Sequence, residues 1–146
     1  MPLIENKKVH FNYEILEKLE AGLELLGLEV KSLRGKHGSL DGSYITVRGN
    51  EVFLIGANIP AYQPTNTPKN YDQHRPRKLL LTKTEISELI GKEKVKGLTI
   101  VPISLYNKGS KIKLSLGIGR GKKKYDKRQS IKKRELDREV RRTLKN

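Results

Sequence analysis

Three kinds of residue in this sequence could, by type and spacing, support chemistry: histidines, clustered glycines and clustered carboxylates. His10, His37 and His74 lie far apart and in no metal-ligand spacing, which favours exposed or structural roles. The chain has no cysteine, so disulfides, thiolate metal sites and cysteine nucleophiles are excluded. The residues therefore predict neither a catalytic set nor a metal site.

The segment GIGRGKK (117–123) has the glycines and lysines of a phosphate-binding loop. A nucleotide-binding loop of this type places four residues between its glycines and a Ser or Thr after its lysine, and both are missing here. We interpret these glycines as the end of a strand that frays into a flexible neck.

The densest carboxylates are Glu14, Glu17, Glu20 and Glu24. In a strand, three of them would share one solvent-exposed face, which is typical of a solvated surface rather than an acid/base pair. A carboxylate in a basic protein can still accept hydrogen bonds from base amino groups or ribose hydroxyls. The sequence therefore predicts a binding protein that is not an enzyme and has no cofactor.

The charge of the chain indicates a polyanionic partner. Lys and Arg number 31 against 16 Asp and Glu, which gives a net charge of +15, and residues 119–146 alone hold 13 basic and 4 acidic residues. A dense phosphate backbone favours such clusters through counterion release. The competing polyanion is a membrane surface, but the tail has no Trp or Phe to bury there. With no signal peptide or long apolar run, we expect a cytoplasmic protein.

The basic tail, 119–146, has too few large apolar side chains to order itself. If it is helical, Leu136, Val140 and Leu144 form one narrow stripe among arginines. We expect a tail that is disordered alone and becomes helical when RNA supplies phosphates. The alternative is a disordered extension that clings to RNA without specificity.

The element that would carry Glu20 is ambiguous in sequence. Over 13–25 the apolar residues share odd positions, as in a strand, but they also make a passable helical face. We favour a strand with a bulge at Gly22. Gly27 and Gly35 then bracket a short helix over 29–34.

The middle of the chain is predicted to form a hairpin, a loop and a helix. Residues 43–56 predict a hairpin that turns at Gly49 and Asn50, and the proline-rich stretch 58–78 predicts a long surface loop. Residues 79–81 predict a short buried strand. Thr82 and Glu85 form a capping-box pair that opens a helix, and Gly91 should end it.

Two further strands are expected over 98–106 and 111–118, joined by the turn NKGS. In the second, apolar residues alternate with Lys111, Lys113, Ser115 and Gly117, which predicts one buried face and one basic, wet face. The total is five or six strands and two helices. We expect a mainly β fold, a small antiparallel barrel over 1–118 followed by the tail 119–146.

Several blocks occur in an order that resembles a known family. They are ENKKVHFNYEI, EAGL with GLEVKSLR, RPRKLLL, KGLTIVP and GRGKKKYDKR. Together they resemble the small protein B family, the tmRNA-binding proteins of bacterial trans-translation. The resemblance implies an OB-like barrel with peripheral helices. It also implies a monomer that binds the tRNA-like domain of tmRNA, is delivered with alanyl-tmRNA and elongation factor Tu, and rescues stalled ribosomes.

The same resemblance implies two sets of site residues. The tmRNA contacts would be Asn6, Lys7, Glu20, Leu80 and Lys113. The tail residues that would meet small-subunit rRNA in the empty messenger channel are Lys122, Lys123, Tyr125, Asp126, Lys127, Arg128 and Leu144. For Leu80, inside three consecutive leucines, a place in the core is an equal alternative. Two other functions stay open: a constitutive ribosomal or rRNA-assembly protein, and a nonspecific nucleic-acid-compacting protein.

Overall fold

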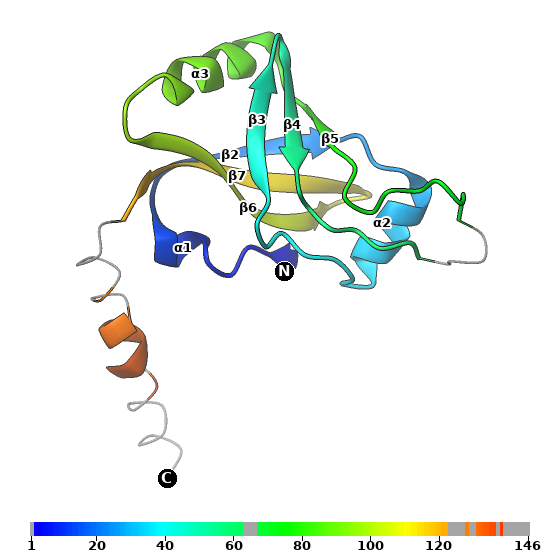
Figure 1. The fold of residues 1–146 in the computed structure, drawn as a ribbon, viewed down its shortest axis with the longest axis horizontal. Helices are drawn as coiled ribbons and strands as arrows, with labels where there is room; N and C mark the ends of the chain where they lie inside the picture. Colours follow the sequence, from blue (N-terminus) through cyan, green and yellow to red (C-terminus); the bar gives the residue numbers. More distant parts are fainter. Residues whose placement is uncertain (1, 63–66, 123–127, 129–130, 137, 139–146) are drawn as a thin grey trace.

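The sequence folds into one antiparallel sheet with short helices at its margins (Figure 1). The computed structural model describes residues 2–62, 67–122, 128, 131–136 and 138. The elements in these residues are β1 (Pro2–Glu5), α1 (Val9–Asn12), β2 (Tyr13–Leu23), α2 (Gly27–Arg34), β3 (Tyr44–Arg48), β4 (Glu51–Ile55), β5 (Arg77–Leu80), α3 (Lys83–Glu93), β6 (Leu98–Lys108) and β7 (Lys111–Gly121). The sheet order is β1-β6-β7-β2-β5-β4-β3. The mainly β prediction is confirmed.

The three long strands β6, β7 and β2 form the centre of the sheet. Along β7, Ile112, Leu114, Leu116 and Ile118 are buried, as their alternation predicts. The β3–β4 hairpin crosses over these strands in Figure 1, and the main core lies between the two layers. β3 lies against β6, although no ladder joins the two among the described residues.

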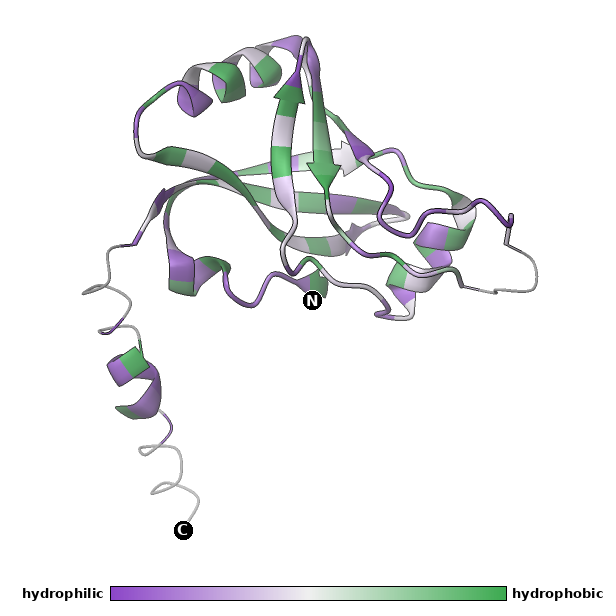
Figure 2. Ribbon diagram, in the orientation of Figure 1, coloured by the Kyte–Doolittle hydropathy of each residue, from purple (hydrophilic) through white to green (hydrophobic). Residues whose placement is uncertain are grey.

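The predicted hairpin and both predicted helices are present. Gly49 takes a positive φ of 60° in the β3–β4 turn. Thr82 and Glu85 form the expected capping box of α3, and Figure 2 shows hydrophobic and hydrophilic residues alternating along that helix. The prediction that Gly91 ends α3 is wrong. Its φ is not positive, so it does not interrupt the helix, which continues to Glu93.

The bulge in β2 lies at Leu16, not at Gly22 as predicted. The register against β7 shifts between Ile15 and Glu17, so the side chain of Leu16 is 45% exposed. Gly22 instead pairs regularly with Leu80 on one side and Lys113 on the other. The bulge moves Ile15 to the face of the sheet opposite the main core.

On that opposite face, α1 covers one end of the sheet, which the sequence did not predict. Val9 of α1 packs with Val101 and Ile103 of β6, together with Tyr13 and Ile15 of β2. These five residues form a second, smaller apolar cluster. The cluster marks where the outer face of the sheet stops being open to solvent.

Gly117 and Gly119 make room for this cluster, and the strand continues to Gly121, so the interpretation of these glycines as a frayed neck is wrong. β7 runs to Gly121, and Gly117 and Gly119 are buried within it. A Cβ on Gly117 would lie 3.0 Å from side-chain atoms of both Ile15 and Ile103. Glycine at this position lets the side chains of the apolar cluster beneath α1 pack closely on the backbone of β7.

Replacing Gly117 with Ala should therefore lower the free energy of unfolding by about 1–3 kcal/mol, because the added methyl overfills this contact. Denaturant unfolding measures the change. Gly121→Ala is the matched control, since nothing lies within 4 Å of a Cβ there. Equal stabilities for the two variants would contradict this role of Gly117.

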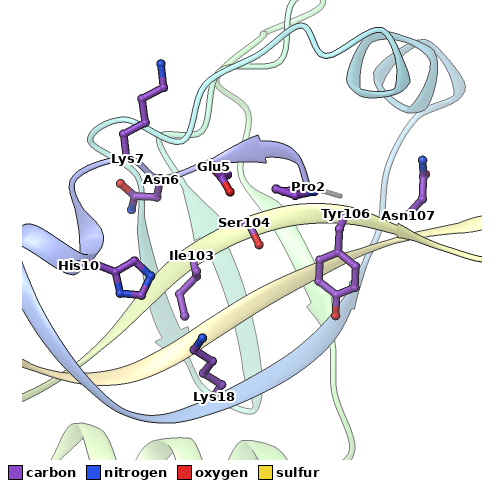
Figure 3. A pocket seen from close by; sticks show the side chains of 10 residues that line it. All are labelled: Pro2, Glu5, Asn6, Lys7, His10, Lys18, Ile103, Ser104, Tyr106 and Asn107. Carbon is purple, nitrogen blue, oxygen red and sulfur yellow. The ribbon is translucent and has the colours of Figure 1, made fainter. Parts of the chain in front are cut away.

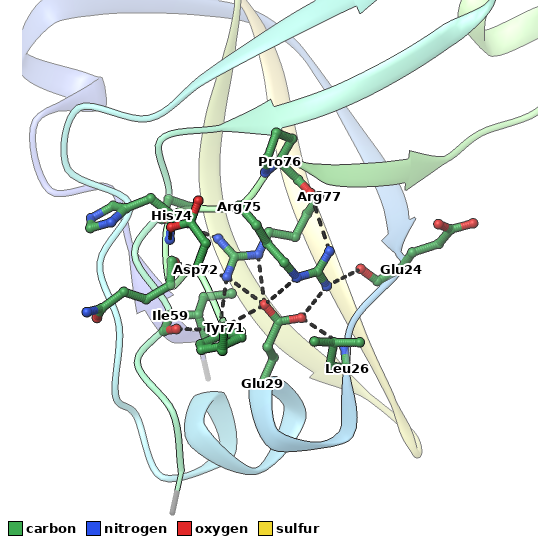
Figure 4. A network of polar contacts seen from close by, with 12 residues as sticks. Glu24, Leu26, Glu29, Ile59, Tyr71, Asp72, His74, Arg75, Pro76 and Arg77 are labelled. Atoms are coloured by element: carbon green, nitrogen blue, oxygen red, sulfur yellow. Dashed lines mark hydrogen bonds and ion pairs between the residues drawn. The ribbon is translucent and has the colours of Figure 1, made fainter. Parts of the chain in front are cut away.

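A buried ion-pair network fixes the long loop between β4 and β5 (Figure 4). Glu29 of α2 and Arg77 of β5 are both fully buried, and Arg77 donates to Glu29 Oε2 at 2.6 and 3.0 Å. Arg77 also donates to the carbonyl of Ala57 at 2.7 Å, and Arg75 forms a second ion pair with Glu29. The C-terminal end of the loop is thus held against α2.

Tyr71 belongs to the same network. Its hydroxyl lies 2.6 Å from the carbonyl oxygen of Ile59 and 3.0 Å from Glu29 Oε2. Both oxygens can accept the hydroxyl proton. Burial, followed by the neighbouring Glu29 carboxylate, raises the pKa of Tyr71 to about 12. The hydroxyl therefore stays protonated and holds the loop at neutral pH.

Candidate nucleic-acid interface

The part of the outer sheet face that α1 leaves uncovered is the candidate site, called the open face below. Strand register places Leu80, Gly22, Lys113 and Tyr106 in one row across β5, β2, β7 and β6. The next row joins Glu20, Ser115 and Ser104. With flanking residues on the same strands, the open face consists of Lys18, Glu20, Gly22, Leu80, Ser104, Tyr106, Lys108, Lys113 and Ser115.

Leu80 lies outside the core, which excludes the core alternative left by the sequence, while its contact with RNA stays a prediction. Its side chain is 51% exposed, whereas Leu79 beside it is 2% exposed. A Cβ on Gly22 would lie 3.4 Å from Leu80 and 3.5 Å from Lys113 Nζ. Because Gly22 has no side chain, Leu80 and Lys113 approach each other over its backbone. An apolar side chain and a cation are thus presented side by side.

Glu20 is held on the open face by two residues of β6. Tyr106 donates its hydroxyl to Glu20 Oε2, and Lys108 Nζ donates to Glu20 Oε1 at 2.8 Å. The hydrogen bond from Lys108, then that from Tyr106, lower the pKa of Glu20. Burial, followed by the Glu20 carboxylate, raises the pKa of Tyr106 to about 12. Glu20 is therefore an ionised acceptor with a fixed direction.

Asn6 and Lys7 lie at a neighbouring groove between the end of β1, α1 and β6. The groove has a volume of about 490 Å³. In Figure 3, His10 and Lys18 point toward the space around Ile103, whereas the side chain of Lys7 extends away from it. Asn6 also has a structural role, because its amide group donates to the carbonyl of Pro102 at 2.9 Å and anchors the chain before α1.

The five predicted tmRNA contacts thus fall into two neighbouring places. Glu20, Leu80 and Lys113 share the open face, and Asn6 and Lys7 border the groove, whose wall includes Tyr106 of the open face. The combination of lysines, one fixed carboxylate and exposed Leu80 suits RNA, because these groups can contact phosphates, base or ribose donors, and base surfaces respectively.

The tail residues are described only in part. Lys122 is half-buried, and its amide donates to the carbonyl of Asn12 at 2.8 Å. Arg128 is exposed, and residues 131–136 are helical and exposed. The other predicted tail residues lie outside the described residues: Lys123, Tyr125, Asp126, Lys127 and Leu144.

Three long side chains of the open face were not predicted from the sequence, those of Lys18, Tyr106 and Lys108, although the turn gave a signal for two of them. The turn at Gly109 and Ser110 pairs Lys108 with Lys111, which places Tyr106 opposite Lys113. Counting outward from that turn would have put Tyr106 and Lys108 on the wet face. Their contact with Glu20 crosses β7 and leaves no local signal in the sequence.

Two kinds of site are not found in the described part of the chain. The described residues contain no cluster of three or more His, Cys, Asp and Glu that could hold a metal ion. No helix among them has the length and apolar character needed to cross a membrane.

Comparisons with known proteins agree with each other. The family model described as SmpB protein matches residues 3–146. The SsrA-binding protein of Mesoplasma florum is 49% identical over 140 residues, covering 96% of this chain and 94% of that protein. The SsrA-binding protein of Magnetococcus marinus is 50% identical over 143 residues, covering 98% and 95%.

A solved structure is also similar. It is described in the words "tmRNA-SmpB: a journey to the center of the bacterial ribosome". It superposes with a TM-score of 0.68 at 40% sequence identity, and the match covers 87% of this chain and 92% of that chain.

Proposed function

This chain belongs to the SmpB protein family, and on that basis we propose that it binds the tRNA-like domain of tmRNA and brings it to stalled ribosomes for trans-translation. Its relatives carry the name SsrA-binding protein, and the similar solved structure is described with tmRNA and the bacterial ribosome. The protein acts where ribosomes do, in the cytoplasm.

The observation that carries this proposal is the joint position of Glu20, Leu80 and Lys113. Three strands far apart in sequence place an acceptor, an apolar contact and a cation on one exposed face. Lys113 would bind a phosphate of the RNA elbow, Leu80 would pack on an exposed base or ribose, and Glu20 would accept from base or ribose donors. None of these contacts needs a catalytic group, which fits an RNA-binding protein without enzymatic activity.

Four finer features belong to the same proposal. The contact of β3 with β6 supports a sheet that closes as an OB-like barrel, a fold whose strand face binds oligonucleotides. The tail 119–146 would enter the empty messenger channel and become a helix against small-subunit rRNA. Delivery would occur with alanyl-tmRNA and elongation factor Tu, with the protein as a monomer.

Recovery of RNA with the protein from its own cells tests the function. We expect tmRNA to be enriched far above its share of total RNA. Recovery of rRNA without tmRNA, with the protein present in equal number on all ribosomes, would instead indicate a constitutive ribosomal or rRNA-assembly protein. Indiscriminate RNA and DNA would indicate a nonspecific compacting protein.

Replacing Lys113 with Ala should weaken binding of the tRNA-like domain roughly tenfold, because a charge-assisted contact to phosphate is lost. The slope of log affinity against log salt should fall by about one. Affinity measured at several salt concentrations gives both values. Lys96→Ala, an exposed lysine between α3 and β6, is the control and should change neither. An unchanged salt slope would remove Lys113 from the RNA contacts.

A further inference from the structure

Two side chains of β6 reach across β7 to hold a carboxylate of β2. Tyr106 and Lys108 each donate to a different oxygen of Glu20. Glu20 and the β6 residues are not on adjacent strands, since β7 lies between them in the sheet. The arrangement is therefore a bridge across the open face, built by residues more than 80 positions apart in sequence.

Small residues beneath the bridge make it possible. Ser115 of β7 pairs with Glu20 on one side and with Ser104 on the other. A long side chain at Ser115 would stand between Glu20 and Tyr106, because Ser115 rises from the same face on the strand between them. The register thus leaves a free path over β7 for the tyrosine and the lysine.

We propose that Tyr106 is a positioning residue of the RNA-binding face, whose hydroxyl aims the Glu20 carboxylate at hydrogen-bond donors of unpaired bases or ribose. This inference rests on the proposed function and assigns Tyr106 a role within it. Tyr106 acts through Glu20, and its partner in the bridge is Lys108.

The acceptor capacity of Glu20 supports this role. An ionised carboxylate offers about four lone-pair sites on its two oxygens. Tyr106 uses one site on Oε2, and Lys108 uses one on Oε1. Each oxygen therefore keeps capacity for a donor on RNA, while the carboxylate loses the rotational freedom that an exposed glutamate otherwise has. Orienting the group before binding lowers the entropy lost on binding.

The charged and titratable groups around Glu20 favour its ionised form. They are Lys108 and Tyr106 of β6 and Lys113 of β7, and the hydrogen bonds from the first two lower the pKa of Glu20. Lys18 lies on the same strand. Without the Tyr106 hydroxyl, the pKa of Glu20 should rise toward its ordinary value. RNA binding through Glu20 would then be lost at a higher pH as the solution is acidified.

The test is Tyr106→Phe, which removes the hydroxyl and keeps the ring, in the full chain. We expect affinity for the tRNA-like domain of tmRNA to fall about 2- to 10-fold at neutral pH. The pKa of Glu20 in the free protein, followed by NMR, should rise. In a Glu20→Gln background the same change should add almost nothing, because the group that Tyr106 positions is already altered.

Tyr44→Phe is the matched control, since Tyr44 is an exposed tyrosine on β3 outside the open face. It should leave affinity and the pKa of Glu20 unchanged. Lys108→Met, which removes the other half of the bridge, should also raise the pKa of Glu20 and gives a second measurement if Tyr106→Phe does not fold.

The outcomes separate this inference from the proposed function. If the wild-type chain does not bind the tRNA-like domain, the proposed function fails. If the wild type binds and Tyr106→Phe matches Tyr44→Phe in affinity and in the pKa of Glu20, the positioning role is overturned. A full additional loss from Tyr106→Phe in the Glu20→Gln background would also overturn it, because Tyr106 would then act without Glu20.

Discussion

Replacing Glu29 with Gln should lower the free energy of unfolding by about 3–5 kcal/mol. The change leaves the guanidinium of Arg77, which is fully buried, without its anionic partner. A single buried charge of this kind costs far more than a lost surface ion pair. The loop from β4 to β5 should loosen as well, since Arg75 and Tyr71 also bind Glu29. Denaturant unfolding measures the first effect and hydrogen exchange of residues 67–76 the second.

Glu51→Gln is the control for charge removal alone. Glu51 forms an exposed ion pair with Lys78 at 3.2 Å, and such pairs contribute about 0–1 kcal/mol. If the two variants were equally stable, the buried network would not be what holds the loop.

The pH dependence of stability gives a second measure of Glu29. Burial opposes its ionisation most strongly, but hydrogen bonds from Arg75, the Leu26 amide and Arg77 together outweigh burial, so the pKa of Glu29 is lowered. Ionisation of Glu29 therefore stabilises the fold fully at pH values above the pKa that Glu29 has in the unfolded chain. This contribution is lost as the pH falls through the lower pKa that Glu29 has in the folded protein. The stability gap between wild type and Glu29→Gln should accordingly narrow in acid.

Removal of residues 123–146 should abolish peptide tagging on stalled ribosomes while leaving the affinity for the tRNA-like domain nearly intact. The residues proposed to bind the tRNA-like domain all lie upstream, on β2, β5, β6 and β7 and at the groove. The removed segment is strongly basic and has few apolar residues, and its residues 131–136 form an exposed helix, which suits binding to the phosphates of rRNA. Peptide tagging in a reconstituted translation system measures the expected loss, and affinity for the tRNA-like domain at fixed salt measures what is retained.

A tail of the same composition in scrambled order is the matched control. It keeps the charge but loses the residues predicted to meet the decoding centre, and it should also fail to support tagging. If the scrambled tail worked, charge alone would account for the segment. If the truncated chain still supported tagging, the division of roles between the sheet domain and the tail would be wrong.

Local patterns predicted most of the fold correctly. The hairpin at Gly49, the capping box at Thr82 and the alternation in β7 depend on neighbours in sequence, and all three are present. Errors arose where a glycine could serve either of two structural roles. Gly91 and Gly22 looked like a helix end and a bulge, but the first lies within α3 and the second makes room for Leu80.

Features that depend on distant partners could not be predicted in this way. Glu29 and Arg77 are 48 residues apart, and nothing near either residue indicates a buried pair. The cluster under α1 depends on a register shift at Leu16 that brings Ile15 to the outer face. These features appear only once the strands are placed side by side.

The candidate site was predicted through resemblance more than through physics. Alternation alone placed Lys113 on a wet face, and the register now joins it to Glu20 and Leu80. Alternation could not place Leu80, because three consecutive leucines show no preference for either face. The tail residues beyond Lys122, apart from Arg128, lie outside the described residues, so their roles stay predictions.

The measurement that tests the central claim most directly compares two RNAs at one salt concentration. The tRNA-like domain of tmRNA and a plain duplex of equal length compete for the full chain and for its Glu20→Gln/Lys113→Ala variant. We expect the wild type to prefer the tRNA-like domain strongly and the variant to lose most of this preference while keeping its weak, salt-sensitive binding to duplex. Equal affinity of the wild type for both RNAs would contradict the claim that the open face recognises the tRNA-like domain.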